Sequence, residues 1–178
     1  PMRYAWLIFI AMPLALAPGL APAAGAQARR GLLVEAGPTV NAWGSRVGAY
    51  HFWHLSDQWL FDLGASHSLF FPRDRPAGQV TAGGHLRYLF DVLRIVPSVH
   101  VGIGFGSLAD EGVPVTELEV GLSADYMLSR RVQLGLAVSG VTALYGGGGI
   151  DVGEADPVET VTRVQVLLRF QWVFGETW

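Results

Sequence analysis

Residues 161–174, VTRVQVLLRFQWVF, decide the fold of this 178-residue chain. Large apolar side chains alternate there with polar ones such as Arg163, Gln165 and Arg169. Successive side chains of a β-strand point to opposite faces of the sheet. The alternation therefore predicts a strand over about 158–174 with one apolar face.

Seven further segments alternate in the same way. They predict strands over about 31–42, 46–54, 58–70, 79–90, 94–107, 115–128 and 131–145. Glycine interrupts any helical pattern, and past residue 30 no segment has the features of a spanning helix.

The polar faces of these segments indicate which side meets the solvent. A soluble sandwich or lipocalin-like barrel exposes its polar face to water, and that face is usually rich in Lys and Glu. Here the polar faces are rich in Gly, Ser, Ala and Thr with isolated charges. Small residues suit the narrow interior of a closed barrel, and the larger apolar residues then face lipid. We therefore expect an all-β fold, an eight-stranded antiparallel up-and-down transmembrane β-barrel.

The connections between the segments alternate in length. The second and third segments join tightly around Ser56-Asp57, the fourth and fifth around Val92-Leu93, and the sixth and seventh around 129–131. The connections after the third, fifth and seventh segments are longer. Outer-membrane barrels have short periplasmic turns and longer outer loops, so the tight turns are expected in the periplasm.

The first 28 residues have the layout of a secretory signal peptide. A basic start at Met2-Arg3 precedes an apolar run and a small-residue cleavage site at Ala26-Gln27-Ala28. The apolar run, about 13 residues before Pro18, is short of the about 20 that a membrane anchor needs. We expect 1–28 to be a cleaved signal peptide and 29–178 to be the barrel domain.

With these features in place, the chain resembles the small eight-stranded outer-membrane barrels of the OmpA/OmpX type. The resemblance covers about residues 30–174 and rests on pattern rather than on a diagnostic motif. Phe170, Trp172 and Phe174 resemble the C-terminal assembly signal of that family. Trp178 takes the place of its terminal aromatic residue, although Glu176 interrupts the alternation.

The resemblance implies a location and a set of partners. The location is the outer membrane of the Gram-negative cell envelope, reached by export. The implied partners are outer-membrane lipid, lipopolysaccharide and the barrel-assembly machinery. A monomer is expected.

The inward faces carry charges that a narrow barrel must pair, because an unpaired buried charge is costly. We predict an interior polar plug formed by Glu35, Asp62, His85, Arg87, His100, Glu117, Glu119, Asp125, Arg163 and Arg169. The alternatives for these groups are a narrow path for protons or small ions, and a catalytic group.

Two tight turns also predict strand register. A turn at Ser56-Asp57 sets His51 opposite Asp62 inside the barrel and turns Tyr50 and Phe52 toward lipid. A turn at Val92-Leu93 sets two histidines opposite each other inside the barrel, His85 and His100.

Several function classes are disfavoured. The chain has no cysteine, and its net charge of −3 offers no case for nucleic-acid binding. It has no P-loop, dinucleotide fingerprint or HExxH motif, so we assign no catalytic, cofactor-binding or metal-binding residue. Some small barrels are lipid A hydrolases or acyltransferases that use Ser and His. However, the adjacent His67 and Ser68 should point to opposite faces.

The sequence therefore favours a non-enzymatic outer-membrane barrel with a structural or surface-interaction role. The alternatives are a narrow porin-like solute or ion channel and a lipid A-modifying barrel enzyme.

Overall fold

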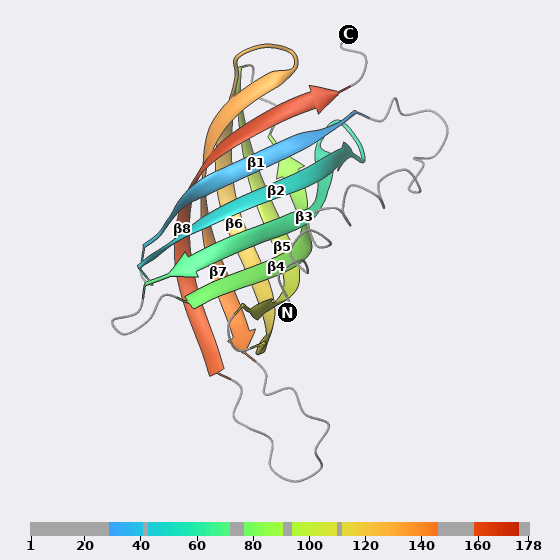
Figure 1. Ribbon diagram of the computed structural model, residues 1–178. Helices are drawn as coiled ribbons and strands as arrows, with labels where there is room; N and C mark the ends of the chain where they lie inside the picture. The colour runs from blue at the N-terminus through green and yellow to red at the C-terminus, as the bar shows by residue number, and fades with distance from the viewer. Residues whose placement is uncertain are drawn as a thin grey trace.

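The computed structural model is a closed barrel of eight antiparallel strands (Figure 1). It describes residues 29–40, 43–71, 77–90, 94–109, 112–145 and 159–174. The strands are β1 (Arg30–Thr39), β2 (Gly44–His54), β3 (Trp59–Phe70), β4 (Ala77–Leu89), β5 (Ile95–Leu108), β6 (Pro114–Met127), β7 (Val132–Tyr145) and β8 (Glu159–Phe174). Each strand pairs with the next along the chain, and β8 pairs with β1. The predicted fold class is confirmed.

Some predicted features lie outside the described residues. They are the signal peptide 1–28, the terminal Trp178, and the loop positions Asp74, Glu111 and Gly148. Among the described residues, no helix is long and apolar enough to cross a membrane.

The strands form because their side chains alternate between two different environments. Along β6 the odd-numbered residues from Val115 to Asp125 are buried, whereas Leu118, Val120 and Leu122 are exposed on the outside. Aliphatic residues on one face and small or charged residues on the other match the period of two that a half-buried strand requires.

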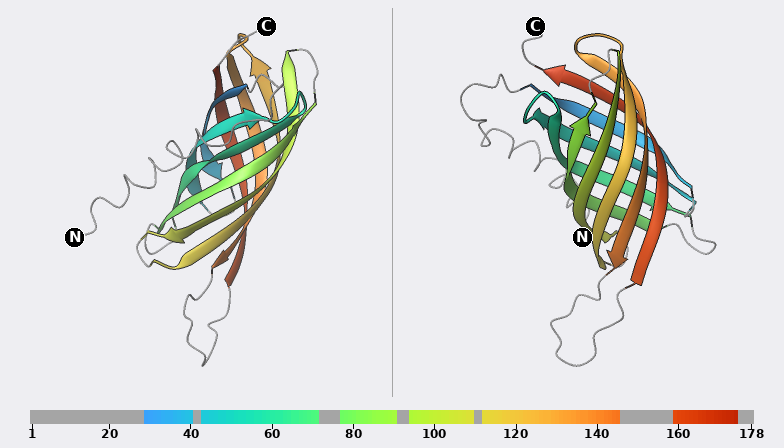
Figure 2. Two further views of the ribbon diagram at one scale, coloured as in Figure 1. Left: turned by 90° about the vertical axis from the view of Figure 1, so that its right-hand side faces the viewer. Right: turned by 180° about the vertical axis from the view of Figure 1, so that it is seen from behind.

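The strands are strongly tilted, as Figure 2 shows from two sides. A circuit of paired residues that starts at Arg30 on β1 returns to β1 ten residues later, at Val40. The circuit passes through Trp53, Phe61, Leu86, Val101, Val120, Gly140 and Val164. This shear fixes the tilt and the bore, and it brings residues far apart in sequence to the same height inside.

The two ends of the barrel differ. We name the end where β1 begins and β8 ends the turn end, and the opposite end the loop end. At the turn end the hydroxyl of Ser56 accepts a hydrogen bond from the backbone N–H of Trp59 at 3.1 Å. Ser129 makes the same contact with the N–H of Val132, also at 3.1 Å. The turns after β2 and β6 are therefore closed by the same short-range hydrogen bond.

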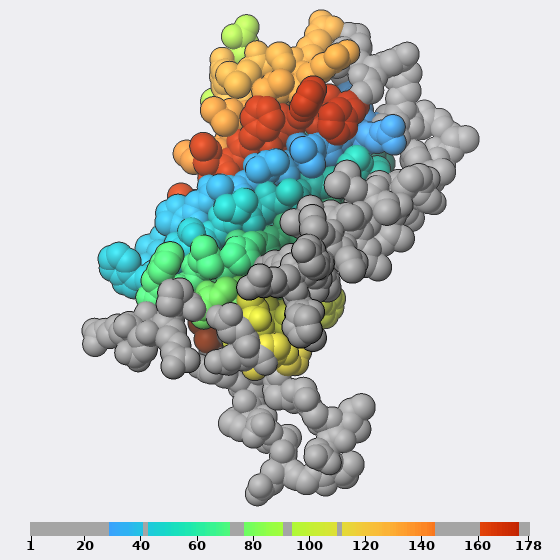
Figure 3. All heavy atoms as spheres, viewed as in Figure 1, coloured from blue at the N-terminus to red at the C-terminus, as the bar shows by residue number. Residues whose placement is uncertain are grey.

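The outer surface is apolar. Figure 3 shows the face on which β8, β1 and β2 lie side by side. Leu136, Leu168 and Val120 on the outer face expose 55–65% of their surface, more than a soluble protein commonly leaves to water in a continuous band. Such a band suits hydrocarbon, where closed barrels are stable because every backbone group is paired.

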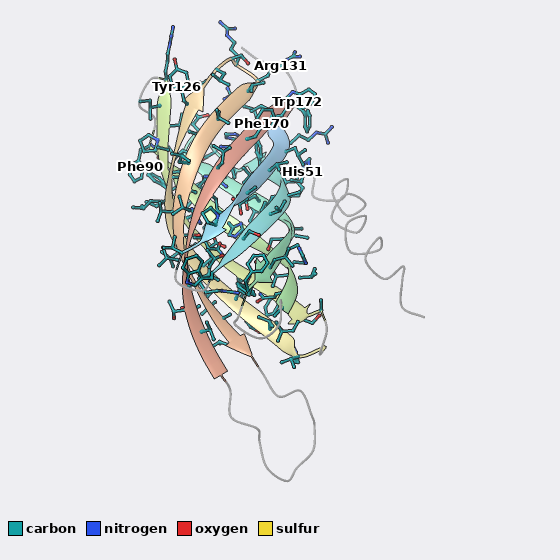
Figure 4. All side chains as sticks on the ribbon, turned by 60° about the vertical axis from the view of Figure 1, so that its left-hand side comes forward. His51, Phe90, Tyr126, Arg131, Phe170 and Trp172 are labelled. Atoms are coloured by element: carbon teal, nitrogen blue, oxygen red, sulfur yellow. The ribbon has the colours of Figure 1, made fainter. Side chains whose placement is uncertain are left out.

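Aromatic side chains gather on this surface near the turn end, and Figure 4 labels four of them. The group contains Trp59, Phe61, Tyr88, Phe90, Tyr126, Phe170, Trp172 and Phe174. Neighbouring rings touch, with centroids 5.0 Å apart for Trp59 and Tyr88 and 5.5 Å apart for Trp172 and Phe174. A belt of this kind is typical of the membrane–water interface.

The predicted register of β2 against β3 is wrong by one residue. Asp62 pairs with Phe52 and not with His51. A shift of one residue turns every side chain to the other face, so Tyr50 and Phe52 lie inside and His51 lies outside. The error arose from the turn: the backbone N–H of Leu55 bonds to the carbonyl of Trp59, so three residues, 56–58, separate the facing pair rather than two.

The predicted register of β4 against β5 is wrong by two residues. His85 pairs with Gly102, and His100 pairs with Arg87. Because the shift is even, the inward and outward faces are unchanged. The connection here is longer than the predicted two-residue turn, since β4 ends at Leu89 and β5 begins at Ile95.

The apolar band makes a quantitative prediction. Leu168→Arg should lower the free energy of unfolding from lipid vesicles by about 2–4 kcal/mol, because it places a charge near the middle of the band. The matched control is Leu128→Arg in a turn, where the leucine has nearly the same exposed fraction, 58% against 55%. A Leu168→Arg barrel as stable as the control would show that this face does not meet hydrocarbon.

Candidate functional site

The candidate site is the interior of the barrel. The structure buries all ten residues assigned to the polar plug, each with an exposed fraction of 8% or less. They are distributed over five strands besides β1: β3, β4, β5, β6 and β8. Hydrogen bonds divide them and their polar neighbours into three clusters along the barrel axis.

The loop-end cluster is centred on Glu117. Its carboxylate accepts hydrogen bonds from the amide of Gln79 at 2.6 Å and the hydroxyl of Thr81 at 3.1 Å. The guanidinium of Arg163 also bonds to this carboxylate and donates to Gln79 at 3.1 Å. Arg163 lies over the ring of Phe70, 4.5 Å from its centroid. The cluster thus ties β4, β6 and β8 together across the bore.

The central cluster joins Arg46 on β2 to Glu119 on β6. One nitrogen of Arg46 donates to Glu119 and to Gln165, both at 2.9 Å. The other terminal nitrogen donates to the Tyr50 hydroxyl at 2.9 Å. The second carboxylate oxygen of Glu119 lies 3.3 Å from Nε2 of His100. Glu119 is therefore held from several sides of the barrel.

His85 connects the central cluster to the turn-end cluster. Its Nδ1 lies 2.5 Å from Asp62, and its Nε2 lies 3.4 Å from Glu119. Each ring nitrogen of His85 thus faces a carboxylate. Both carboxylates receive a hydrogen bond only when both nitrogens carry a proton, and the imidazole is then cationic.

The turn-end cluster contains two arginines. Arg87 donates to Asp62 at 2.7 Å. Arg169 lies 3.9 Å from Glu35 and 3.6 Å from Asp125, and it also bonds to Ser123. The two ion pairs of Arg169 are looser than the Arg87–Asp62 pair and than the Arg163–Glu117 pair at the loop end.

Glycine makes room for the histidines. A Cβ atom at Gly102 would collide with the ring of His85, and one at Gly121 would collide with the ring of His100. The glycines on the inward faces are therefore part of the packing around the charged groups. A side chain at either position would displace an imidazole from its carboxylate.

The buried charges nearly balance. Among the described residues, five carboxylates face four guanidinium groups, and a protonated His85 supplies the fifth positive charge. Buried charges are tolerated when they are paired and hydrogen-bonded, and removal of one partner leaves the other uncompensated. The charged side chains of the interior are paired in the way that this rule requires.

The sequence analysis missed six hydrogen-bonding members of these clusters: Arg46, Tyr50, Gln79, Thr81, Ser123 and Gln165. A signal for Arg46 was present, because it alternates with Gly48 as inward charges alternate with glycine on other strands. The wrong face assigned to β2 obscured that signal.

Two of the spaces that the described residues line bear on the bore. One, beside Arg46, His85 and Glu119, has a volume of about 10 Å³. That is close to the space one water molecule occupies. The other, which we name the turn-end cavity, has a volume of about 440 Å³ and is lined by the turn-end residues of β2 to β8 together with Arg29 and Asp57.

Neither plug histidine is positioned to activate a serine. The interior histidines His85 and His100 face carboxylates rather than a serine hydroxyl. A serine nucleophile needs a histidine within hydrogen-bond reach. In the part of the chain that the structure describes, no group of three or more histidine or carboxylate side chains is arranged to hold a metal ion.

Comparison with known proteins agrees at the level of the fold. No protein-family model matches the chain, and no curated protein matches it. The outer membrane enzyme PagL is similar in structure, with a TM-score of 0.56 and 12% identity over 78% of this chain and 97% of PagL. Neisserial surface protein A (NspA) has a TM-score of 0.53 and 11% identity over 83% of this chain and 96% of that protein. A designed transmembrane β-barrel has a TM-score of 0.52 and 13% identity over 84% of this chain and 98% of its own.

These similarities show the fold alone. The chain has the fold of a small eight-stranded membrane barrel, and the similar natural proteins come from outer membranes or cell surfaces. Their activities are not transferred to this chain by identities of this size.

The Arg163–Glu117 pair provides a test of the loop-end cluster. Arg163→Ala should lower the free energy of unfolding by about 3–5 kcal/mol, because Glu117 then remains buried without its guanidinium partner. Arg131→Ala in an exposed turn is the control and should change it by less than about 0.5 kcal/mol.

A double variant separates charge pairing from packing. Arg163→Met combined with Glu117→Leu removes both charges and should recover most of the lost stability. Folding into vesicles, followed by urea titration, measures all four proteins. A double variant that is less stable than Arg163→Ala would contradict the pairing explanation.

Proposed function

We propose that this chain is a non-enzymatic, monomeric protein of the bacterial outer membrane. In this proposal its signal peptide directs export and the barrel-assembly machinery inserts it. The barrel contacts lipid and lipopolysaccharide and presents its loops at the cell surface. Its bore is closed by the polar plug, so the role is structural or a surface interaction rather than transport.

The observation that carries the proposal is the central cluster. Arg46, Glu119 and Gln165 come from three strands and meet in the bore with contacts of 2.9 Å. The cavity beside them has space for about one water molecule. An ion that crossed at this height would have to break charge-assisted hydrogen bonds, which are the stronger kind.

A second candidate function is proton transfer along the axis. Asp62, His85, Glu119 and His100 form a row in which neighbouring groups lie 2.5–3.4 Å apart. A row of titratable groups suits protons better than larger ions, because it needs no open bore. In this candidate function protons cross the membrane through the bore, whereas in the first nothing crosses it there.

Conductance and proton flux separate the two candidates. In planar bilayers the wild-type protein should show no channel steps, whereas Glu119→Ala combined with Arg46→Ala should open a conducting path. Leu122→Ala on the outer face is the control and should behave as wild type. Steps in the wild-type protein would favour the porin-like alternative.

Proton flux is measured in vesicles with a trapped pH-sensitive dye. Wild-type flux that His85→Gln abolishes would favour the proton relay. The enzymatic alternative is tested in cells: expression should leave the mass of lipid A unchanged, and a mass shift would contradict the non-enzymatic role.

The proposed orientation places the turn end in the periplasm. Because the chain has no cysteine, single cysteines report topology cleanly. A cysteine at Gly148 or Glu111 should react with an impermeant thiol reagent on intact cells. A cysteine at Asp57 or Arg130 should react only after the outer membrane is opened. Labelling at 57 or 130 but not at 148 on intact cells would reverse the orientation.

A further inference from the structure

The inner wall changes character near the turn end. Through the centre and the loop end it carries charges, amides and hydroxyls, whereas half of the residues that line the turn-end cavity are apolar. The apolar side chains that line the turn-end cavity are Phe52, Leu60, Leu89, Val96, Met127 and Val173.

An apolar wall is unfavourable in a mouth filled only with water. Phe52 and Leu60 are packed in a small core with Leu33 and Tyr50, with Val173 packed against them. Leu89, Val96 and Met127 remain only half-buried. An occupant that covered these side chains would remove further apolar surface from water, so this part of the wall favours an apolar occupant.

The size of the cavity fits a small molecule. Its volume of about 440 Å³ lies within the range of about 300–1,000 Å³ for small-molecule sites. Such sites are usually apolar with a few polar groups that orient the ligand. Here the uncharged polar groups on the wall are Gln133 and Gln171.

Asp125 supplies a charged group on the same wall. Its exposed fraction is 2%, its Oδ1 accepts no hydrogen bond from the described residues, and its Oδ2 lies 3.6 Å from Arg169. Gly135 on β7 leaves the space that Oδ1 occupies, because a Cβ there would collide with it. Asp125 lines the cavity and is held by Arg169 only loosely, so a ligand ammonium group that entered the cavity would donate a charge-assisted hydrogen bond to this carboxylate.

Two other charged groups on the wall, Arg29 and Asp57, carry opposite charges, so Asp125 leaves the wall with a net negative charge. Arg29, His54 and Asp57 also line the cavity, and they belong to the end of β2 and to residues outside the strands at the turn end. Among the described residues, the guanidinium groups of Arg87 and Arg169 do not line it. Asp125 is thus the charged group that a ligand meets when its apolar body packs among the side chains of the strands.

We propose that the turn-end cavity binds a small amphipathic cation. Its ammonium group donates to Asp125, and its apolar body packs against Phe52, Leu60 and Met127. The site lies on the turn-end side of the plug and does not require the bore to conduct.

The probe for this test is dansylcadaverine, a primary amine with an apolar fluorescent body. With the full barrel in phosphatidylcholine nanodiscs, its fluorescence should rise saturably above the signal of empty discs. The neutral analogue dansyl-butylamide should bind about tenfold more weakly, the loss of one charge-assisted hydrogen bond. Asp125→Asn should remove this preference, so that both probes bind the variant alike.

A second pair of variants does not depend on Asp125. Leu89→Trp should fill the cavity and reduce the saturable binding of both probes at least about tenfold. Leu122→Trp, the same exchange on the outer face, should leave binding unchanged. Equal wild-type affinity for the two probes, or full binding by Leu89→Trp, would overturn the proposal.

Discussion

Closure of the barrel by the pairing of β8 with β1 is the constraint on which the rest of the structure depends. Hydrocarbon offers backbone N–H and C=O groups no partner, so a sheet within it is stable only when no edge remains. Arg30 pairs with Phe174 and Thr39 with Gln165, so the last strand completes the first along its length. With eight strands and a shear of ten residues, closure also fixes how much room the interior offers.

That narrow interior explains the composition of the inward faces. Where two long side chains cross the bore, a neighbouring strand provides glycine, as Gly102 does for His85. Where charge is buried, it is buried with its partner, as for Arg46 and Glu119. The shear decides which strands meet, which is why these two residues, 73 positions apart in the chain, form one contact.

The sequence predicted the strands and most of their faces because both follow from a period of two. It could not predict the ion pairs, because partners across a bore depend on shear, and shear is the sum of all eight registers. The turn after β2 shows that one residue in a turn is enough to change the predicted face of every side chain on a strand. One additional turn residue moved the register by one and reversed the faces of Tyr50, His51 and Phe52 relative to the prediction. The even shift between β4 and β5 left the faces intact, so the positions of His85 and His100 inside were predicted although their pairing was not.

The reversal on β2 has a physical cause beyond the turn. In most strands the inward residues are smaller or more polar than the outward ones, but β2 turns Tyr50 and Phe52 inward and His51 outward. Local deviations from an otherwise consistent pattern are expected at functional positions, where another requirement outweighs it. Phe52 is also part of the wall of the turn-end cavity. Phe52 and Leu60 help to close the bore on that side, because they pack in a core with Leu33 and Tyr50. Leu89, Val96 and Met127 stay half-buried, and they are the part of the wall that the proposed occupant would cover.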